Sequence, residues 1–398
     1  MATANPLPGA ETASHPSTAP VLVLLAPLRL EQLNAVLAHL AACIDPQSLL
    51  IATADDSARD SLSDLRMVAA PATRSSWIST AADYVNAFQL AQEHNAHAIL
   101  MLGPECGSLA LHGLRALADA VSGTATDLAL PCYDLPPHAS LVNSAILYPL
   151  SRALFASPAR FPMAIDLGLS LRMAERLSTA AQHLIALNQP TLPLWPVNEA
   201  ATAGFVINEF GAGARVLPQP SEPDLNAVLP LVVGSLFSDV EAKAAFWQRP
   251  RQLPPPGNHP HISQIPAPAP ASGPASLIQA FRLAYTNLQE IWSLVLPPNS
   301  LLGLKRLSLT EGAAFRMPET LWARIVYDFL LAYRQRTIHR GHLFGALIPL
   351  YLAWVASHIN VTTSGANPEH HIESVAAAFE IEKPYLVSRW RWPDRFNP

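Results

Sequence analysis

Charged residues are scarce in this chain of 398 residues: Asp, Glu, Lys and Arg together make up 14% of it, against roughly 25% in soluble domains. Hydrophobic residues make up 50%, which excludes a chain that stays disordered because it cannot build a core. The net charge is −5 and no block of basic residues occurs, so nothing in the composition favours binding of nucleic acid.

Cysteine is rare as well. Cys43, Cys106 and Cys132 form no CxxC pair and cannot all pair with one another, which predicts reduced thiols and a cytoplasmic protein. The longest apolar run, 343–355, contains Pro349 and falls short of the roughly 18–20 residues of a spanning helix, so we expect no transmembrane segment. No positive charge precedes the first apolar run, so we expect no signal peptide.

Several catalytic and nucleotide-binding motifs are missing too: the sequence has no P-loop, no GxSxG elbow and no HExxH helix. Gly211-Ala212-Gly213 is similar to the start of a dinucleotide-binding loop, but Val216 stands where the third glycine is needed. We interpret that segment as a plain turn. His370 and His371 open a predicted helix, and we interpret them as part of a solvated turn rather than as metal ligands.

What the sequence does contain is an alternation of short apolar runs with helical stretches. Runs typical of buried strands occupy 21–25, 49–53, 68–70, 98–102, 128–131 and 204–207, and helical spacing occupies 31–42, 77–94, 142–154 and 168–187. This alternation predicts an α/β fold built on a doubly wound, mostly parallel sheet.

Proline marks the domain organisation. It is dense in 251–275, which we interpret as a stiff linker. We therefore predict a loose tail over 1–19, an α/β domain over 20–250 and an all-helical C-terminal region over 276–398. Because the apolar faces of these C-terminal helices need cover, we expect them to pack back on the first domain. Self-association into a homo-oligomer through the same helices stays a hypothesis.

An ordered series of short sequence words resembles bacterial glycosyltransferases of the GT-A fold, in the group around glucosylglycerate and mannosylglycerate synthases. Residues 143–154 (NSAILYPLSRAL) and 166–170 (DLGLS) are similar to the family patterns N-S-x-x-Y-P-L-T-R-A-L and G-D-F-G-L-S. Further words follow in the same order around Trp195, in 225–237 and in 383–386, so the resemblance covers most of residues 20–390.

This resemblance implies the transfer of a sugar from a nucleotide-diphosphate sugar to a small acceptor, either glycerate-type or carbohydrate. By their places in the family pattern, Asp166 is implied to be catalytic, and Asn143 and Arg152 to bind the acceptor. The residues alone leave other interpretations open. Asp166 would equally well cap the helix expected from Gly168, and Asn143 would equally well make hydrogen bonds in the core.

Nucleotide-sugar binding is implied for residues at or near the ends of predicted strands, because ligands of doubly wound sheets bind where the strands end. The residues concerned are Pro27, Asp55, Asp56, Arg74 and Glu105. Here too a plainer interpretation stays open: the two aspartates form a solvated turn, and the arginine is simply exposed.

The positions that carry metal ligands in the family are altered. Gly103-Pro104-Glu105 stands where Asp-x-Asp is expected, and Leu217 stands where a histidine is expected. A single carboxylate makes a poor Mg²⁺ site, so we expect no resident metal and no other cofactor. Mg²⁺ or Mn²⁺ would bind only if Glu105 and the substrate phosphates sufficed.

Three functions are therefore left open by the sequence. The first is a glycosyltransferase with altered or lost metal dependence. The second is a catalytically inactive relative that acts as a binding or interaction protein. The third is an α/β nucleotide-binding protein outside this family, for which Asn143, Arg152 and Asp166 need not line a common cleft.

Overall fold

The computed structural model describes residues 19–28, 30–54, 65–71, 77–123, 125–163, 165–218, 224–250 and 273–392. Several predictions fall outside these ranges. They concern nearly all of the tail 1–19, the residues Asp55, Asp56 and Arg74, and most of the linker 251–275.

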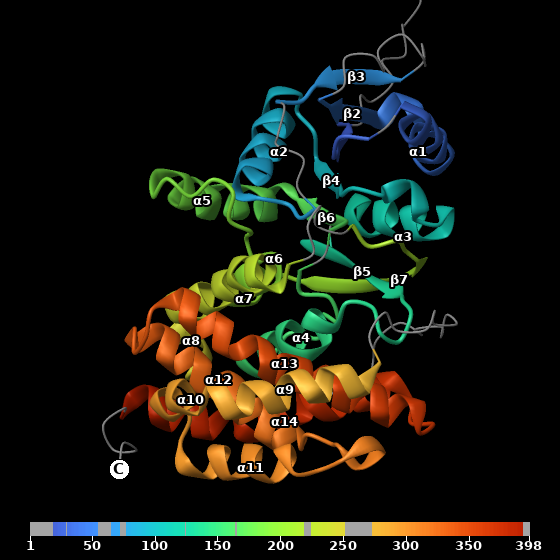
Figure 1. Ribbon diagram of the computed structural model, residues 1–398. Coiled ribbons are helices and arrows are strands. Elements are labelled where there is room, and N and C mark those ends of the chain that lie inside the picture. The colour runs from blue at the N-terminus through green and yellow to red at the C-terminus, as the bar shows by residue number, and fades with distance from the viewer. Residues whose placement is uncertain are drawn as a thin grey trace, which may run out of the picture.

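The strands of the described residues form one seven-stranded sheet, which occupies the upper part of Figure 1. They are β1 (Val21–Leu25), β2 (Leu49–Thr53), β3 (Arg66–Ala69), β4 (Ala98–Leu102), β5 (Leu128–Asp134), β6 (Leu167–Ser170) and β7 (Ile207–Ala214). Their order is β3-β2-β1-β4-β6-β5-β7. Strand β6 runs antiparallel to both of its neighbours, and the other pairings are parallel. The predicted mostly parallel α/β sheet is confirmed.

Helices cover both faces of this sheet. They are α1 (Leu30–Cys43) and α3 (Leu111–Ser122) on one face and α2 (Ala81–Glu93) and α5 (Leu171–Ala186) on the other. Neighbouring side chains of a strand point to opposite faces. In β1, Val21 and Val23 accordingly pack with α1 and α3, while Leu22 packs with α2 and α5. The run is apolar throughout because both of its faces are buried.

Two segments differ from the sequence-based expectation. The helix expected from Gly168 begins only at Leu171, and Ser170 caps it by accepting a hydrogen bond from the amide of Met173. The preceding residues form β6, whose glycine is needed because a Cβ there would lie 2.3 Å from a methyl carbon of Val121. The predicted turn at 211–213 is instead part of β7, where a β-bulge interrupts the pairing with β5.

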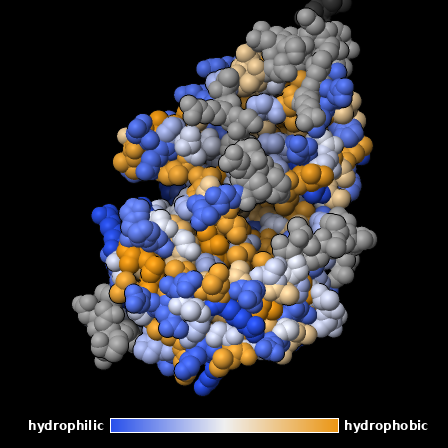
Figure 2. All heavy atoms as spheres, viewed as in Figure 1, coloured by the Kyte–Doolittle hydropathy of each residue, from blue (hydrophilic) through white to orange (hydrophobic). Residues whose placement is uncertain are grey.

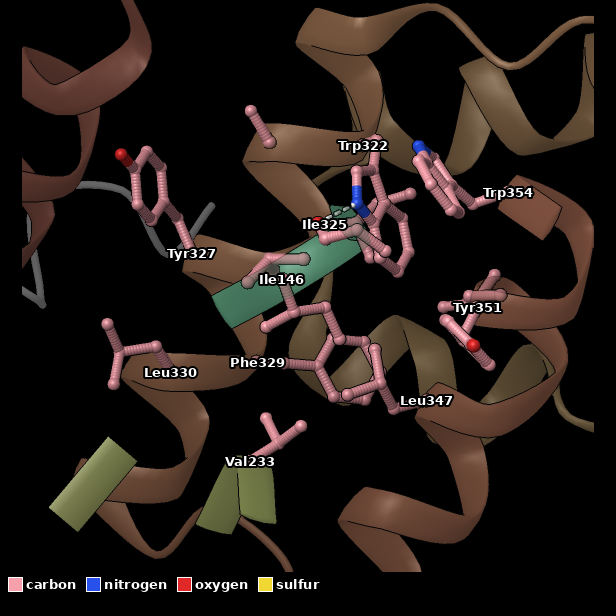
Figure 3. Close-up of a cluster of buried hydrophobic side chains, with 14 of the residues drawn as sticks. Ile146, Val233, Trp322, Ile325, Tyr327, Phe329, Leu330, Leu347, Tyr351 and Trp354 are labelled. Atoms are coloured by element: carbon pink, nitrogen blue, oxygen red, sulfur yellow. Dashed lines mark hydrogen bonds between the residues drawn. The ribbon is translucent and has the colours of Figure 1, made fainter. Parts of the chain in front are cut away.

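The lower half of the molecule in Figure 1 is helical. Its elements are α4 (Tyr148–Phe155), α6 (Pro196–Ala203), α7 (Leu225–Ala242), α8 (Ala244–Trp247), α9 (Pro274–Asn287), α10 (Gln289–Val295), α11 (Pro298–Ser308), α12 (Glu319–Gln335), α13 (Arg340–Thr363) and α14 (Pro368–Arg391). The C-terminal helices share one apolar core with α4, α7 and the π-helical turn Asn143–Leu147, all of which precede the linker. Figure 3 shows Ile146, Val233, Phe329 and Leu347 meeting in this core.

Two helices of the described residues, α7 and α13, are long and apolar enough to cross a membrane by length and composition alone. Contrary to the expectation from Pro349, α13 continues through that proline over 24 residues. In its most apolar stretch 72% of the residues are buried inside the protein. Core helices of globular proteins pass the same test of length and apolarity.

A cluster of histidines lies between α13, α14 and the loop that follows β5. His358 and His371 share a hydrogen bond of 2.8 Å between their Nδ1 atoms, and Trp354 stacks on both rings. Both side chains are buried, so His371 is not the solvated residue that its sequence predicted. Burial lowers the pKa of His358 to about 3, and the positive charges that His371, His138 and Arg160 can carry act in the same direction.

Acid is therefore expected to destabilise the protein through His358. In the unfolded chain its pKa returns to about 6.5, so between pH 3 and 6.5 the unfolded state binds more protons and stability falls as the pH falls. Between pH 7 and 5 we expect the free energy of unfolding of the wild type to drop by about 2 kcal/mol more than that of His358→Gln. Urea unfolding at both pH values measures this difference. Equal drops in the two proteins would contradict it.

Candidate functional site

A cleft lies where four neighbouring strands end. The residues that follow β1, β2, β3 and β4 line it together with the first half of α2. Its lining includes Ala26, Pro27, Ala54, Ala70, Pro71, Ile78, Ser79, Asp83, Asn86, Gly103 and Pro104. This is the edge at which doubly wound sheets bind their ligands, and Pro27 is among the residues that line it.

Asp166 lies at the same edge because β6 runs antiparallel. Its position just before β6 places it beside the carboxyl end of β4, and Leu167 pairs with Met101. The Asp166 carboxylate is 0% exposed. It accepts hydrogen bonds from the amide of Gly103 at 3.0 Å and from the hydroxyl of Tyr133 at 2.8 Å.

The third partner of Asp166 is Arg215, which directly follows β7. Arg215 Nε lies 2.9 Å and Nη2 3.2 Å from the carboxylate oxygens, and neither side chain is exposed. The guanidinium also donates to the carbonyls of Pro104 and Glu105 and to the hydroxyl of Ser108. Burial alone would lower the pKa of Arg215, but the charge and hydrogen bonds of Asp166 raise it above its ordinary value. The guanidinium of Arg215 thus stays charged, and its donors are taken up inside the protein.

Glu105 stands apart from this pair. Its backbone takes the left-handed conformation, with φ of +61°, and its exposed side chain lies 3.5 Å from the amide of Gln32. Burial raises the pKa of the neighbouring Cys106 to about 12, which marks a packed thiol rather than a thiolate ligand. Throughout the described ranges no group of three His, Cys, Asp or Glu side chains is placed to hold a metal ion.

These residues do not fit a divalent cation. The carboxylate nearest to the loop of Glu105, that of Asp166, is taken up by a guanidinium, a phenol and an amide. Leu217, at the position where the family pattern calls for a histidine, has no donor atom in its side chain. A cation held by Glu105 alone would need water and ligand oxygens for the rest of its coordination shell.

A second hollow of about 260 Å³ adjoins the strand-end cleft, and Ile78 lines both. It lies between the end of β5, the turn 143–147, α7 and α13, and its lining is mostly apolar. The lining residues include Trp77, Tyr133, Ser140, Leu141, Val142, Asn143, Phe161, Met163, Leu217, Val228, Val232 and Tyr351. Figure 2 shows hydrophobic residues exposed at mid-height on this face of the molecule.

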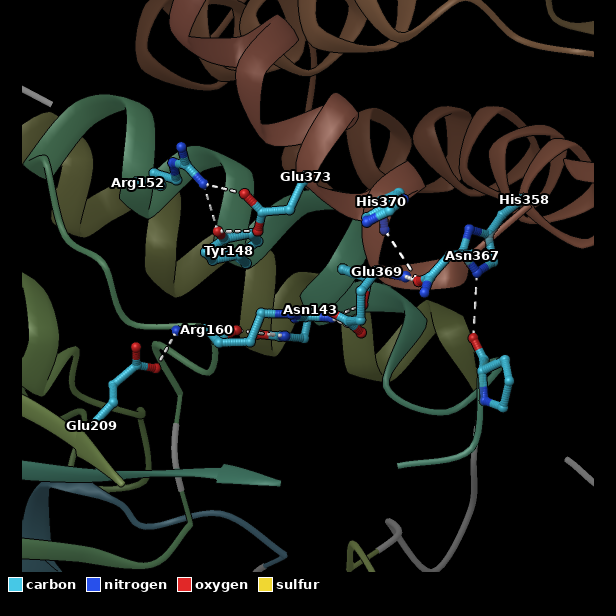
Figure 4. A network of polar contacts seen from close by, with 12 residues as sticks. Asn143, Tyr148, Arg152, Arg160, Glu209, His358, Asn367, Glu369, His370 and Glu373 are labelled. Atoms are coloured by element: carbon cyan, nitrogen blue, oxygen red, sulfur yellow. Dashed lines mark hydrogen bonds and ion pairs between the residues drawn. The ribbon is translucent and has the colours of Figure 1, made fainter. Parts of the chain in front are cut away.

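The structure separates the two residues for which acceptor binding was implied. Asn143 lines the second hollow and donates to the carbonyl of Arg160 at 3.1 Å. Arg152 lies instead between α4 and α14, where it forms an ion pair with Glu373 at 2.5 Å (Figure 4) and another with Glu380 at 2.6 Å. Arg152 lines neither hollow, and its ion pairs join the α/β part to the last helix.

Sequence reasoning missed Arg215 and Tyr133 as partners of Asp166. Arg215 stands two residues before Leu217, the position where the family pattern calls for a histidine, and the pattern itself assigns no role to it. The available signal was the strand order, because the ends of β4, β5 and β7 and the start of β6 all lie at one edge of the sheet.

Comparison with known proteins finds solved structures that are similar to this chain, but it assigns the chain to no family. No family model matches the chain, and no curated relative matches it. Glucosyl-3-phosphoglycerate synthase from Mycobacterium tuberculosis, solved with Mn²⁺, UDP and phosphoglyceric acid, is 14% identical with a TM-score of 0.38, over 56% of this chain and 78% of that chain. CMP:2-keto-3-deoxy-manno-octonic acid synthetase, solved with CTP, is 11% identical with a TM-score of 0.33, over 56% of this chain and 99% of that chain.

The class of protein follows from the sheet itself. Its strand order, its single antiparallel strand between parallel neighbours and the helical region below it define a GT-A-like α/β fold with a C-terminal helical region. The candidate site comprises the strand-end cleft, the adjoining hollow and the buried pair of Asp166 and Arg215 beside them.

Breaking this buried pair is expected to destabilise the protein strongly. Arg215→Met leaves the Asp166 carboxylate buried without its charged partner, which costs about 3–5 kcal/mol in comparable cases. The double variant Asp166→Leu, Arg215→Met is expected to recover part of the loss, because no buried charge is left over. Denaturant unfolding of the three proteins measures both effects.

A control uses an ion pair whose arginine is exposed. Arg172 is 63% exposed and pairs with Asp127, whose buried carboxylate also accepts hydrogen bonds from the Ser170 hydroxyl and the Val206 amide, so Arg172→Met is expected to lose less stability than Arg215→Met. Similar losses in the two single variants would show that the pair of Asp166 and Arg215 is no more important than a pair with an exposed arginine.

Proposed function

We propose that this protein binds a nucleotide-diphosphate sugar in the strand-end cleft and transfers the sugar to an acceptor held in the adjoining hollow, without a resident divalent cation. The observation that carries the proposal is the contiguity of the two hollows through Ile78, at the edge where the parallel strands end. A two-substrate transfer needs two neighbouring sites that hold the reacting atoms within about 3–3.5 Å.

The lining of the cleft suits the nucleotide part of such a donor. Asn86 offers an amide from α2, and the backbone around Pro27 and Gly103 lines the opposite wall. We assign the diphosphate to Arg74, because charge that develops on a leaving nucleotide needs a positive group when no metal supplies it. We assign Asp55 and Asp56 to the base or ribose of the nucleotide. These three residues lie outside the described part of the chain.

Asp166 takes part in this proposal as a positioning residue. Its carboxylate holds the amide of Gly103, and its partner Arg215 holds the carbonyls of Pro104 and Glu105. These contacts fix the position of the loop that borders the donor cleft. The effect of Asp166 on the reaction therefore passes through that loop and not through direct contact with the sugar.

The lining of the second hollow favours an uncharged acceptor. None of its described lining residues is charged, and its polar groups include Tyr351, Asn143 and Ser140. The carboxylate of a glycerate-type acceptor would lose water there without gaining a charged partner, which is unfavourable. An alcohol or carbohydrate with an apolar part would bury that part against Trp77 and Met163.

A second candidate function is nucleotide-sugar binding without catalysis. Asp83 is the single carboxylate among the described residues that line the two hollows. It caps α2 by accepting hydrogen bonds from the amide and hydroxyl of Thr80 at 2.7 and 2.8 Å. No carboxylate of this described lining is thus free to act as a general base for the acceptor hydroxyl, and this observation is the one that supports the second candidate.

Donor binding is expected to be independent of divalent metal. UDP-glucose and other nucleotide-diphosphate sugars are expected to raise the melting temperature by mass action, equally with EDTA and with Mn²⁺. Asn86→Ala is expected to weaken binding about three- to tenfold through the loss of one hydrogen bond. Gln89→Ala, on the same helix but outside the lining, serves as the control. A shift that appears only with Mn²⁺ would contradict metal independence.

Acceptor choice tests the second hollow. Calorimetry is expected to show that octyl β-glucoside, below its micelle concentration, binds and that glycerate does not. Val228→Asp is expected to weaken that binding at least tenfold, because it places a charge in the apolar lining, whereas Val228→Ala changes it little. Glycerate binding instead would overturn the uncharged-acceptor assignment. Donor binding with no sugar transfer to either compound would favour the second candidate function.

A further inference from the structure

A polar groove lies at the end of the molecule away from the sheet, between α11, α12 and α14 (Figure 1). It has a volume of about 380 Å³ and shares no lining residue with the strand-end cleft or the second hollow. The groove is lined by residues of α11, of the segment that leads into α12, and of the first turns of α12, with Glu382 of α14 at its side.

Three arginines give this groove a positive charge. Arg306 comes from α11, Arg316 from the segment before α12, and Arg324 from α12 itself. Glu382 neutralises one of them, since its carboxylate lies 2.8 Å from Arg324 Nε. Arg316 donates through Nη2 to Ser364 at 3.2 Å. The lining thus carries two positive charges in excess, in a chain whose net charge is −5.

The start of α12 adds unsatisfied donors. This helix has 17 residues and begins after Pro318, which has no side chain able to cap it. The first amides of a helix have no partner within it and carry partial positive charge. Thr320 and Leu321, in the first turn, line the groove. The one acidic residue of that turn, Glu319, lies 3.6 Å from a ring nitrogen of His371.

A nearly buried serine points to a ligand independently of these charges. The residue Ser300 is 2% exposed and lines the groove, and its side chain makes no hydrogen bond to another described residue. Buried polar groups in folded proteins are nearly always hydrogen-bonded, so such a group calls for a partner. Nearby, Gly303 lets α11 approach α12, because a Cβ there would lie 2.9 Å from a methyl carbon of Leu321.

We propose that this groove binds a small anion that carries a doubly charged phosphoryl group. Guanidinium groups bind phosphate through paired hydrogen bonds, the start of a helix favours the same anion, and Ser300 supplies a further donor. Two excess positive charges match the two negative charges of a phosphate monoester. The shared chemistry is the phosphoryl group, whether it belongs to a free metabolite or to a lipid headgroup.

Calorimetry of the full chain with inorganic phosphate and pyrophosphate tests the proposal. We expect saturable binding that Arg306→Gln weakens at least tenfold, because charge-assisted hydrogen bonds to phosphate are lost. Lys305→Gln removes the same charge from the neighbouring position on α11, outside the groove lining, and is expected to change binding less than twofold. Ser300→Ala is expected to weaken binding several-fold and to leave binding of nucleotide sugars unchanged.

Flotation with vesicles of phosphatidic acid, against vesicles of phosphatidylcholine, distinguishes the two sources of the phosphoryl group. Binding of free phosphate alone assigns the groove to a soluble ligand. Binding of phosphatidic acid vesicles that Arg306→Gln abolishes assigns it to a headgroup. Absence of saturable binding to phosphate, pyrophosphate and vesicles overturns the proposal. An equal loss in Arg306→Gln and Lys305→Gln overturns it as well, because the attraction would then be diffuse.

Discussion

The ion pair between Asp166 and Arg215 constrains the candidate site more than any other contact. It lies where three strand ends and one strand start meet, and it binds the loop after β4 to the end of β7 across the intervening strands. Both side chains are out of water, so the contact between them, together with several further hydrogen bonds, must offset the cost of burying them. The pair also sets the shape of the donor cleft, because Asp166 binds Gly103 and Arg215 binds Pro104, and both residues line that cleft.

The same contact explains why the site differs chemically from a metal centre. A guanidinium that is already bonded to both oxygens of a carboxylate, to three carbonyls and to a serine hydroxyl has no donor left for a phosphate. The positive charge of Arg215 is balanced by the carboxylate of Asp166 within the protein. Charge stabilisation of a leaving diphosphate must therefore come from another group, which is why the proposed function depends on Arg74 rather than on Arg215 or Glu105.

The elements that the sequence predicted well are those whose pattern has one physical explanation. Runs such as 21–25 and 98–102 are apolar throughout because helices cover both faces of the sheet, and they form strands with those bounds. Strand β6, by contrast, was expected to be part of a helix. It has only four residues, one of them a glycine, and it leads directly into the helix α5, whose apolar residues continue the pattern. Arg152 sits in a family-like word, yet its side chain is directed by Glu373 and Glu380, which lie more than 220 residues away. Such long-range pairing leaves no local pattern to detect.

Arginine accounts for much of the polar architecture of this chain, in which only three of the 25 basic residues are lysine. A planar guanidinium with five donors can bind several buried acceptors at once, whereas a lysine ammonium offers three donors from a single point. Arg215 and Arg160 each use the guanidinium in this way, at sites where the α/β part is joined internally or to α14. Arg306 differs: its guanidinium has no protein partner among the described residues, and it borders a groove that the nearly buried Ser300 also lines. Open guanidinium donors beside a groove that three arginines line are best explained by a ligand from outside the protein.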